Sequence, residues 1–366
     1  MLEGRQQALQ KKLQKENIDL AFINSTIHIR YYTNFVTDPH ERFFVYVYDR
    51  LKDRKLLFLP ELDYEAAKEQ AQVDQIIPVS DTECGYEKLY ETVGASISSI
   101  AIEKDRLTVE QYEKLKSFYP KAQYYRIETF IQEERLVKTA AEINYVKKAI
   151  ELTEDGLDYI LDFVRIGMTE IEIKNELEKY VLSKGAEQMA FDTLVLTGEN
   201  SANPHGVSSL RKVQTGDFLL FDFGVTINGY HSDITRTFIV GEAKEEQVLV
   251  YETVKEANER AIEAVKESKP IKEIDHAARK AIDDANYGNY FIHRTGHGLG
   301  LEVHEQPSIH AENEKLLQKG MLFTIEPGIY LPSLGGVRIE DDIYIDETGK
   351  VEVLTSFPKR LMSIKG

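Results

Sequence analysis

Two aspartates lie on either side of the dipeptide Asn228-Gly229, at a spacing that could bind metal ions. Asn-Gly is typical of a two-residue hairpin turn, because a type I′ turn needs positive φ at both central positions. Such a turn pairs Asp222 with Thr235. It also places Asp233 opposite Gly224, which has no side chain and is expected to leave room for an ion. The aspartates become diagonal neighbours on one face, roughly 7–8 Å apart by Cα, so their carboxylates can converge.

Histidines concentrate in one glycine-rich segment. Four of the nine histidines lie between residues 293 and 310. His297 lies among glycines at positions 296, 298 and 300, which let the backbone approach a ligand closely. Because imidazole is a good ligand for first-row divalent metals, this segment is a candidate for metal binding.

Two carboxylates occur in strongly apolar surroundings. Asp222 lies inside the apolar run 218–223, and Glu326 follows directly after the apolar run 322–325. An unpaired carboxylate in such a position would be costly, because burial removes its hydration. The position of Asp222 therefore favours a bound cation over an ordinary acidic residue, whereas Glu326 taken alone leaves both interpretations open.

An alternating pattern adds a fourth carboxylate. Glu340 lies in the segment 336–342, where period-two spacing puts Arg338 on the same face. Asp341 would point to the opposite face, and we expect it to be solvated. The candidate set of five ligands is Asp222, Asp233, His297, Glu326 and Glu340.

Four carboxylates and one imidazole form an oxygen-rich set that is too large and too hard for one structural zinc ion. They suit two divalent cations that share bridging carboxylates and a bridging hydroxide. Such two-metal sites activate water and stabilise a tetrahedral transition state. The charges support this hypothesis, because four converging carboxylates without cations would repel one another strongly.

The first part of the chain, residues 1–132, alternates helical and strand patterns. This alternation predicts an α/β domain with a mixed sheet. The expected elements are a helix at 2–16, strands at 20–23, 43–48 and 56–59, and a helix that begins with a capping box at 108–111.

The second part, residues 139–366, predicts two units that each contain a helix pair followed by a strand hairpin. Capping boxes at 139–142 and 169–172 mark the first two helices. The expected helices are 139–165, 169–184, 243–267 and 271–285, and the expected strands are 217–227, 230–240, 321–331 and 336–346. We expect the strands to form one curved antiparallel sheet covered by helices, so the whole chain is of the α/β (α+β) class.

Composition narrows the possible partners. The 366 residues carry a formal net charge of −17, which disfavours nucleic acid and membrane surfaces as partners. The sequence has one cysteine and no apolar run long enough for a transmembrane helix. We therefore expect a protein of the cytoplasm.

The motifs resemble those of the pita-bread dinuclear metallopeptidases, and within them prolidases (Xaa-Pro dipeptidases) and Xaa-Pro aminopeptidases. The resemblance covers a creatinase/prolidase-type N-terminal domain, 1–132, and a pita-bread catalytic domain, 139–366. It implies two divalent ions per subunit, Mn²⁺ before Co²⁺, Zn²⁺ or Fe²⁺, a homodimer, and proline-containing dipeptides or short peptides as substrates. The metal ligands that it implies are Asp222, Asp233, His297, Glu326 and Glu340.

The resemblance also implies roles for residues around the metals. His205 would contact the substrate near the scissile bond, and His304 would stabilise the tetrahedral intermediate or move protons. His293 would line the pocket for the residue after the scissile bond. Arg338 would support a ligand or contact substrate, and Glu326 would also accept the proton of the attacking water.

Two features favour a dipeptidase, in which a metal-bridging hydroxide attacks the scissile carbonyl of Xaa-Pro. Arg294 replaces a small residue that is common in this family, and a cation there could bind the free carboxylate of proline. Asp38, His40 and Arg42 lie in a charged loop that could cover the site. The alternatives are an Xaa-Pro aminopeptidase that acts on longer peptides and a non-catalytic scaffold that binds proteins. Methionine aminopeptidases lack such an N-terminal domain, and creatinase-like members have lost ligands that are present here.

Overall fold

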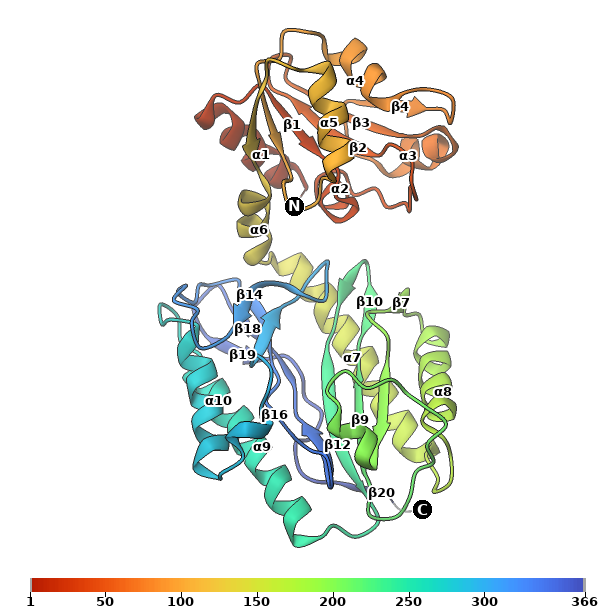
Figure 1. The fold of residues 1–366 in the computed structure, drawn as a ribbon, viewed down its shortest axis with the longest axis vertical. Helices are drawn as coiled ribbons and strands as arrows, with labels where there is room; N and C mark the ends of the chain where they lie inside the picture. The colour runs from red at the N-terminus through yellow and green to blue at the C-terminus, as the bar shows by residue number, and fades with distance from the viewer. Residues whose placement is uncertain (1, 365–366) are drawn as a thin grey trace. The chain divides into compact units, whose positions relative to one another are not determined.

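The computed structural model of the chain describes residues 2–364. It divides into two compact units, Met1–Glu134 and Arg135–Gly366 (Figure 1). The N-terminal unit contains a mixed α/β sheet, and the C-terminal unit contains several smaller sheets between pairs of helices.

The sheet of the N-terminal unit has the strand order β4-β3-β2-β1-β5-β6. Three of its neighbouring pairs are parallel and two are antiparallel, so the predicted mixed sheet is confirmed. The strands are β1 (Leu20–Ile23), β2 (Val45–Asp49), β3 (Arg54–Pro60), β4 (Gln75–Val79), β5 (Ser99–Ile102) and β6 (Gln123–Arg126).

Helices cover both faces of this sheet. Leu89 and Leu115 pack into the same core as Phe22 of β1, which places their helices on one face. Tyr32 stacks on Tyr46 of the next strand, and this contact places a second layer on the opposite face. The helices are α1 (Leu2–Glu16), α2 (Thr26–Thr33), α3 (Tyr64–Gln70), α4 (Gly85–Val93), α5 (Val109–Phe118) and α6 (Glu128–Leu136), with a 3₁₀ turn η1 (Glu61–Asp63).

The C-terminal unit has two helix pairs, as predicted. Capping boxes at Thr139 and Thr169 begin the first pair, because each threonine and a glutamate three residues later satisfy each other's backbone N–H groups. The first pair lies beside β8 (Leu194–Thr197) and β10 (Val225–Ile227), and the second pair lies beside the strands of the second half (Figure 1). The helices are α7 (Ala140–Phe163), α8 (Glu170–Ser183), α9 (Glu245–Ala264) and α10 (Lys272–Asp284), with 3₁₀ turns η2 (Gly198–Ala202) and η3 (Gly288–Tyr290).

The strands of this unit form four small sheets, in the orders β11-β10-β7, β20-β12-β9-β8, β14-β13-β15-β18-β19 and β16-β17. All of these pairs are antiparallel except β12 with β20. The strands are β7 (Gln188–Met189), β8 (Leu194–Thr197), β9 (Phe218–Phe223), β10 (Val225–Ile227), β11 (Tyr230–His231), β12 (Ile234–Val240), β13 (Gly296–Gly298), β14 (Glu305–Ile309), β15 (Leu322–Ile325), β16 (Gly328–Leu331), β17 (Gly335–Arg338), β18 (Asp341–Ile345), β19 (Val351–Val353) and β20 (Ser363–Ile364).

The expected long strands are interrupted at the acidic residues. The strand at 321–331 breaks at Glu326-Pro327, because proline has no N–H for a ladder bond. The strand at 336–346 breaks before Asp341, where the backbone N–H of Glu340 donates to Thr235 O at 3.1 Å instead. This bond joins the second half of the unit to β12, so the ladders change direction where the carboxylates lie.

The turn at Asn228-Gly229 is confirmed. Its φ angles are 49° and 73°, and Asp222 pairs with Thr235 as the turn requires. The expectation for Gly224 is corrected: a Cβ at this position would overlap the backbone oxygen of Ser232. Gly224 therefore makes room for the backbone of Ser232, between β11 and β12, rather than for an ion.

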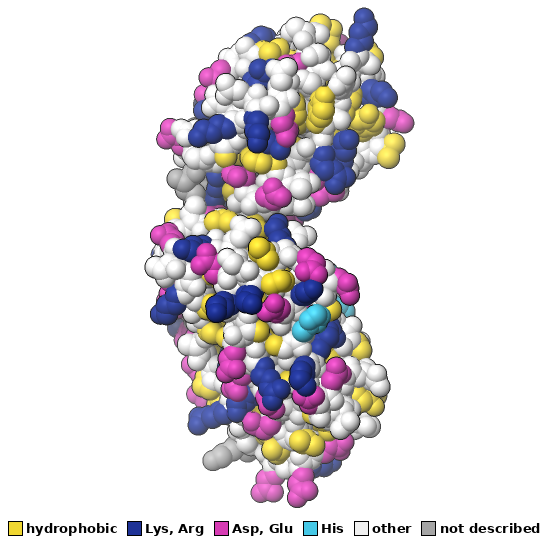
Figure 2. All heavy atoms as spheres, turned by 90° about the vertical axis from the view of Figure 1, so that its left-hand side faces the viewer, with side chains coloured by type: hydrophobic (Ala, Val, Ile, Leu, Met, Phe, Trp, Pro, Cys, Tyr) yellow, Lys and Arg dark blue, Asp and Glu magenta, His cyan; other side chains and the backbone are white. Residues whose placement is uncertain are grey.

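No helix within residues 2–364 has the length and apolar character that a membrane span requires. On the face that Figure 2 shows, acidic and basic side chains are intermixed over both units. The expected absence of nucleic-acid and membrane partners stays a prediction.

Gly224→Ala should destabilise the protein, because the added methyl group meets a backbone atom that cannot move alone. Overpacking of this kind costs about 1–3 kcal/mol, and thermal unfolding measures it. Gly4→Ala is the matched control, since a Cβ on Gly4 of α1 meets nothing within 4 Å. Equal unfolding midpoints for the two variants would contradict this account of Gly224.

Candidate active site

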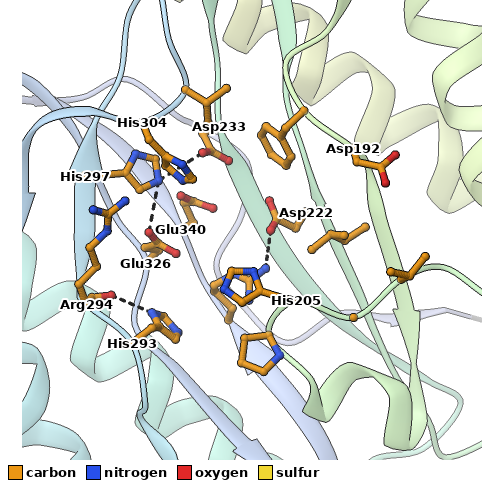
Figure 3. Close-up of a pocket in the computed structure, with 17 residues that line it drawn as sticks. Asp192, His205, Asp222, Asp233, His293, Arg294, His297, His304, Glu326 and Glu340 are labelled. Atoms are coloured by element: carbon orange, nitrogen blue, oxygen red, sulfur yellow. Dashed lines mark hydrogen bonds and ion pairs between the residues drawn. The ribbon is translucent and has the colours of Figure 1, made fainter. Parts of the chain in front are cut away.

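A cavity of about 600 Å³ opens in the C-terminal unit (Figure 3). All of the ligand and catalytic residues that the sequence predicts for this unit line it. The lining residues are Phe191, Asp192, Leu194, Pro204, His205, Gly206, Val207, Asp222, Asp233, His293, Arg294, His297, Val303, His304, Glu326, Arg338 and Glu340.

The loop residues Asp38, His40 and Arg42 belong to the N-terminal unit. There the Arg42 guanidinium donates to Asp81 at 2.8 Å, and the backbone N–H of His40 donates to Asp38 at 3.0 Å. Their role in substrate binding stays a prediction.

The hairpin of β9 and β12 supplies two carboxylates to the cavity. Asp222 accepts a hydrogen bond from Arg338 Nη2 on Oδ2, whereas its Oδ1 is buried without a hydrogen-bond partner among the described residues. Asp233 precedes β12, and its backbone N–H donates to Asp342 Oδ2 at 3.3 Å. A buried carboxylate oxygen without a donor is a vacant ligand atom, because burial without a partner is costly.

His297 presents one ring nitrogen to the carboxylates. Its Nδ1 bonds to Gly298 O at 3.1 Å, and this bond fixes the ring. Its Nε2 lies 3.6 Å from Asp233 Oδ2 and 3.4 Å from Glu326 Oε1 (Figure 3). Burial, reinforced by His304, lowers the pKa of His297 to about 3, so the ring is neutral and Nε2 can bind a metal.

Three carboxylates of this cavity, those of Asp233, Glu326 and Glu340, have raised pKa values. Burial, and then the charge of Glu340, raises the pKa of Asp233 well above its ordinary value. Burial, and then Glu326, does the same for Glu340. Burial raises the pKa of Glu326 to about 7, although Arg338 opposes it. These shifts show that the folded chain alone does not balance the negative charge here.

The donor set fits divalent cations. Ligand atoms of Asp233, His297 and Glu340 lie within 4.8 Å of one another, and all three residues are buried. Glu326 and the unpartnered Oδ1 of Asp222 line the same cavity. Carboxylate oxygens with one imidazole nitrogen suit hard or borderline divalent ions, so the arrangement can bind metal and activate water.

Arg338 is held by Tyr330 and Thr235, to which the sequence pattern assigns no role in the site. Its Nη1 donates to Tyr330 OH at 2.8 Å, and its Nε donates to Thr235 Oγ1 at 3.0 Å. Thr235 Oγ1 in turn donates to Glu340 at 2.7 Å. The contact of Tyr330 with Arg338 depends on the register between β16 and β17 and on the length of the tyrosine side chain. The sequence pattern does not give this register.

The other predicted residues differ in how firmly they are held. His293 is fixed on both ring nitrogens, by Arg294 O at 2.7 Å and Tyr330 OH at 2.8 Å. The Arg294 guanidinium has one hydrogen bond among the described residues, to Ser308 Oγ at 3.3 Å. His205 is exposed in its loop, and the ring of His304 meets that of His297 edge to face at 4.3 Å.

The expectation that Asp341 is solvated is wrong. The residue is 1 % exposed and accepts from Arg236 Nη2 at 2.8 Å and Lys359 Nζ at 2.9 Å. Strand alternation does turn it away from Glu340. Thr355 Oγ1 also donates to Asp341 at 2.6 Å, so the segment after β19 covers the face to which Asp341 points. The local pattern does not indicate this cover.

A second buried ion-pair cluster lies next to His304. Glu305 Oε2 accepts from Lys138 Nζ at 2.9 Å, and Oε1 accepts from Arg135 Nη2. Burial raises the pKa of Glu305, but Lys138 and Arg135 outweigh it and bring the pKa to about 2. This cluster is not apparent from the sequence, because Glu305 lies 167 residues from Lys138 and 170 residues from Arg135.

Comparison with known proteins agrees with this geometry. Residues 144–347 match "Metallopeptidase family M24", and residues 5–137 match "Creatinase/Prolidase N-terminal domain". The chain belongs to metallopeptidase family M24. This membership confirms the resemblance to the pita-bread metallopeptidases, the fold class and the prediction of a metallopeptidase, and it counts against a non-catalytic scaffold.

Relatives of this M24 metallopeptidase cover nearly its whole length. An uncharacterized peptidase of Staphylococcus haemolyticus is 39% identical over 349 residues, which are 95% of this chain and 98% of that protein. A structure of an Xaa-Pro dipeptidase from Bacillus anthracis is 34% identical with a TM-score of 0.90, covering 99% and 100% of the two chains. A structure of an X-Pro aminopeptidase from Thermotoga maritima is also 34% identical with a TM-score of 0.90, covering 98% and 99%.

Glu305→Gln should destabilise the protein at neutral pH and make less difference in acid. The folded-state pKa of Glu305 is about 2, below the ordinary value of 4.5. Its charge therefore contributes stability above pH 4.5, and this contribution is lost as the pH falls from 4.5 through 2. Removing one partner of a buried ion pair costs about 3–5 kcal/mol, which denaturant unfolding at neutral and acidic pH measures.

Glu352→Gln is the control for this experiment, because Glu352 pairs with Lys147 at the surface. Exposed pairs contribute about 0–1 kcal/mol, so we expect little change at any pH. A difference between wild type and Glu305→Gln that is absent at pH 7, or that does not shrink below pH 4.5, would contradict the proposed charge balance.

Proposed function

We propose that this metallopeptidase is an Xaa-Pro dipeptidase, which hydrolyses dipeptides whose second residue is proline. One observation carries the proposal: a single cavity of about 600 Å³ combines the carboxylate cluster with the lightly bonded guanidinium of Arg294. The carboxylates suit metal-assisted hydrolysis. The guanidinium suits the free carboxylate that a dipeptide presents one residue beyond the scissile bond.

We assign two divalent cations to the carboxylate cluster, with Mn²⁺ preferred over Co²⁺, Zn²⁺ or Fe²⁺. When bound, the cations would polarise the scissile carbonyl and lower the pKa of water. The residues proposed to hold them are Asp222, Asp233, His297, Glu326 and Glu340.

Proton transfer is assigned to Glu326. Its carboxylate would take the proton of the attacking water and return it to the proline nitrogen as the peptide bond breaks. Glu326 lines the cavity together with the other proposed ligands, so its carboxylate can reach water held there. His304 and His205 line the same cavity, and their N–H groups are assigned to the developing negative charge on the carbonyl oxygen.

The two arginines of the cavity are suited to different tasks. Arg338 already bonds to Asp222, Tyr330 and Thr235, so its guanidinium is largely committed to positioning ligands. Arg294 bonds only weakly to Ser308 among the described residues, which leaves donors for a substrate carboxylate.

His293 is proposed to line the pocket for proline with the surface of its ring. Both of its nitrogens are already bonded, and burial lowers its pKa to about 4. The residue is therefore neutral at pH 7 and adds no charge toward the substrate carboxylate. Asp38, His40 and Arg42 remain the proposed cover, and a homodimer in the cytoplasm remains the proposed state.

The runner-up function is an Xaa-Pro aminopeptidase. The structures from Bacillus anthracis and Thermotoga maritima resemble this chain equally in identity and TM-score, so the likeness does not favour either substrate length. The bonding of Arg294 favours the dipeptidase, because a longer peptide has an amide where the dipeptide has a carboxylate.

Substrate length tests the proposal. With added Mn²⁺, the wild-type protein should cleave Ala-Pro much faster than Ala-Pro-Ala, and chelator-treated protein should cleave neither. Arg294→Ala should raise the KM for Ala-Pro by roughly tenfold to more than a hundredfold, since a hydrogen bond to a charged group contributes about 1.5–3 kcal/mol. The KM for Ala-Pro-Ala should change little.

Arg165→Ala is the control. Within residues 2–364, the exposed Arg165 bonds only to backbone carbonyls near the end of α7, and it does not line the cavity. It should leave both KM values unchanged. If wild-type protein trims Ala-Pro-Ala and longer peptides as fast as it splits Ala-Pro, the aminopeptidase is the correct assignment.

A further inference from the structure

The loop 299–304 carries His304 back to the metal-ligand cluster. It joins β13 to β14, and Gly298 pairs with Glu305 across the two strands at its base. The register shifts between His297 and Gly298, so the hairpin is irregular where it meets the cavity. The rings of His297 and His304 then lie 4.3 Å apart.

The ring of His304 depends on this loop for its position. Among the described residues it makes no hydrogen bond of its own, and its contact with His297 is edge to face. His231 holds the start of the loop, with its backbone N–H donating to Gly300 O at 2.9 Å and its Nε2 bonding to Leu301 O at 3.1 Å. These bonds reach only residues 300 and 301, so the end of the loop, where His304 lies, must be held by other contacts.

Glu305 supplies that support. Its Oε1 accepts from the backbone N–H of Glu302 at 3.0 Å, which closes the loop on itself. The same carboxylate bonds to Lys138 and Arg135, where the chain enters the unit. The side chains of Lys138 and Glu305 are only 2% and 5% exposed, so water competes little for these bonds.

Lys138 and Arg135 also make contacts with groups other than the Glu305 carboxylate. Lys138 Nζ donates to Arg135 O at 2.6 Å, and Arg135 Nη1 lies 2.8 Å from Glu302 Oε2. The two cations thus hold Glu302 within the loop and Glu305 directly after it. A hydrogen-bonded frame of this kind resists displacement of the residue between them.

We propose that Arg135, Lys138 and Glu305 position His304 for the reaction assigned to this cavity. The inference rests on the proposed function, because it assumes that His304 acts on the substrate. Its physical basis is that catalytic geometry is demanding: a displacement of about 1 Å can cost on the order of 100-fold in rate.

A double-mutant cycle tests whether Lys138 acts through His304. Lys138→Met keeps the shape of the side chain and removes its charge. In Mn²⁺-loaded protein it should lower kcat for Ala-Pro about tenfold or more, with KM and bound metal unchanged. In a His304→Ala background, Lys138→Met should have no further effect on kcat, because coupled residues are non-additive.

Two variants separate positioning from loss of stability. Lys138→Arg keeps a cation and should restore most of kcat. Lys359→Met removes a lysine from the Arg236–Asp341–Lys359 cluster, which has the same composition of one carboxylate between an arginine and a lysine. We expect it to lower the unfolding midpoint as Lys138→Met does while leaving kcat near that of wild type.

An NMR measurement tests the inference without activity. In chelator-treated protein, the imidazole signals of His304 can be assigned by their loss in His304→Ala. They should shift or broaden in Lys138→Met and stay unchanged in Lys359→Met. The signals of His276, which lies on α10 away from the cavity, serve as an internal reference.

The outcomes are separable. A wild-type protein that cleaves no Xaa-Pro dipeptide would contradict the proposed function, and the NMR comparison would still decide the positioning role. Unchanged His304 signals in Lys138→Met overturn the inference. An equal fall of kcat on Lys138→Met with and without His304 also overturns it.

Discussion

Repulsion among buried carboxylates is the constraint around which the C-terminal unit is built. Besides the exposed Asp192, four acidic side chains line one cavity, together with the buried guanidinium of Arg338, which bonds to Asp222. Burial and mutual repulsion raise the pKa values of Asp233, Glu326 and Glu340. A fold can hold such a cluster only on a rigid frame, and bound cations relieve the repulsion.

The frame consists of strands that end or break where the acids lie. Thr235 shows how it is held together: its carbonyl accepts the backbone N–H of Glu340, and its hydroxyl bonds to both Glu340 and Arg338. These contacts join the two halves of the unit at the centre of the cavity. Glu305 plays a similar part next to the cavity. Its buried carboxylate bonds to the cations Lys138 and Arg135 and so fixes the loop next to His304.

The sequence pattern predicted the features that depend on neighbouring residues, namely the hairpin turn and the helix starts. The turn at Asn228-Gly229 fixed the register of Asp222, and threonine capping boxes marked the helix starts. The pattern did not predict contacts between segments that lie far apart in the sequence. Asp341 is buried under Thr355 and Lys359, which both donate to it, and Glu305 pairs with Lys138 from 167 residues away. The family resemblance supplied the roles of single histidines, which spacing alone does not determine.

The number of metal ions bound per chain tests the central claim most directly. Chelator-treated wild-type protein and its Asp233→Ala and Lys359→Met variants would be dialysed against Mn²⁺, and their metal content measured. We predict two ions per chain for the wild type and for Lys359→Met, and at least one fewer for Asp233→Ala. A wild type that binds no Mn²⁺, or an Asp233→Ala variant that still binds two ions, would contradict the assignment of the carboxylate cluster as a metal centre.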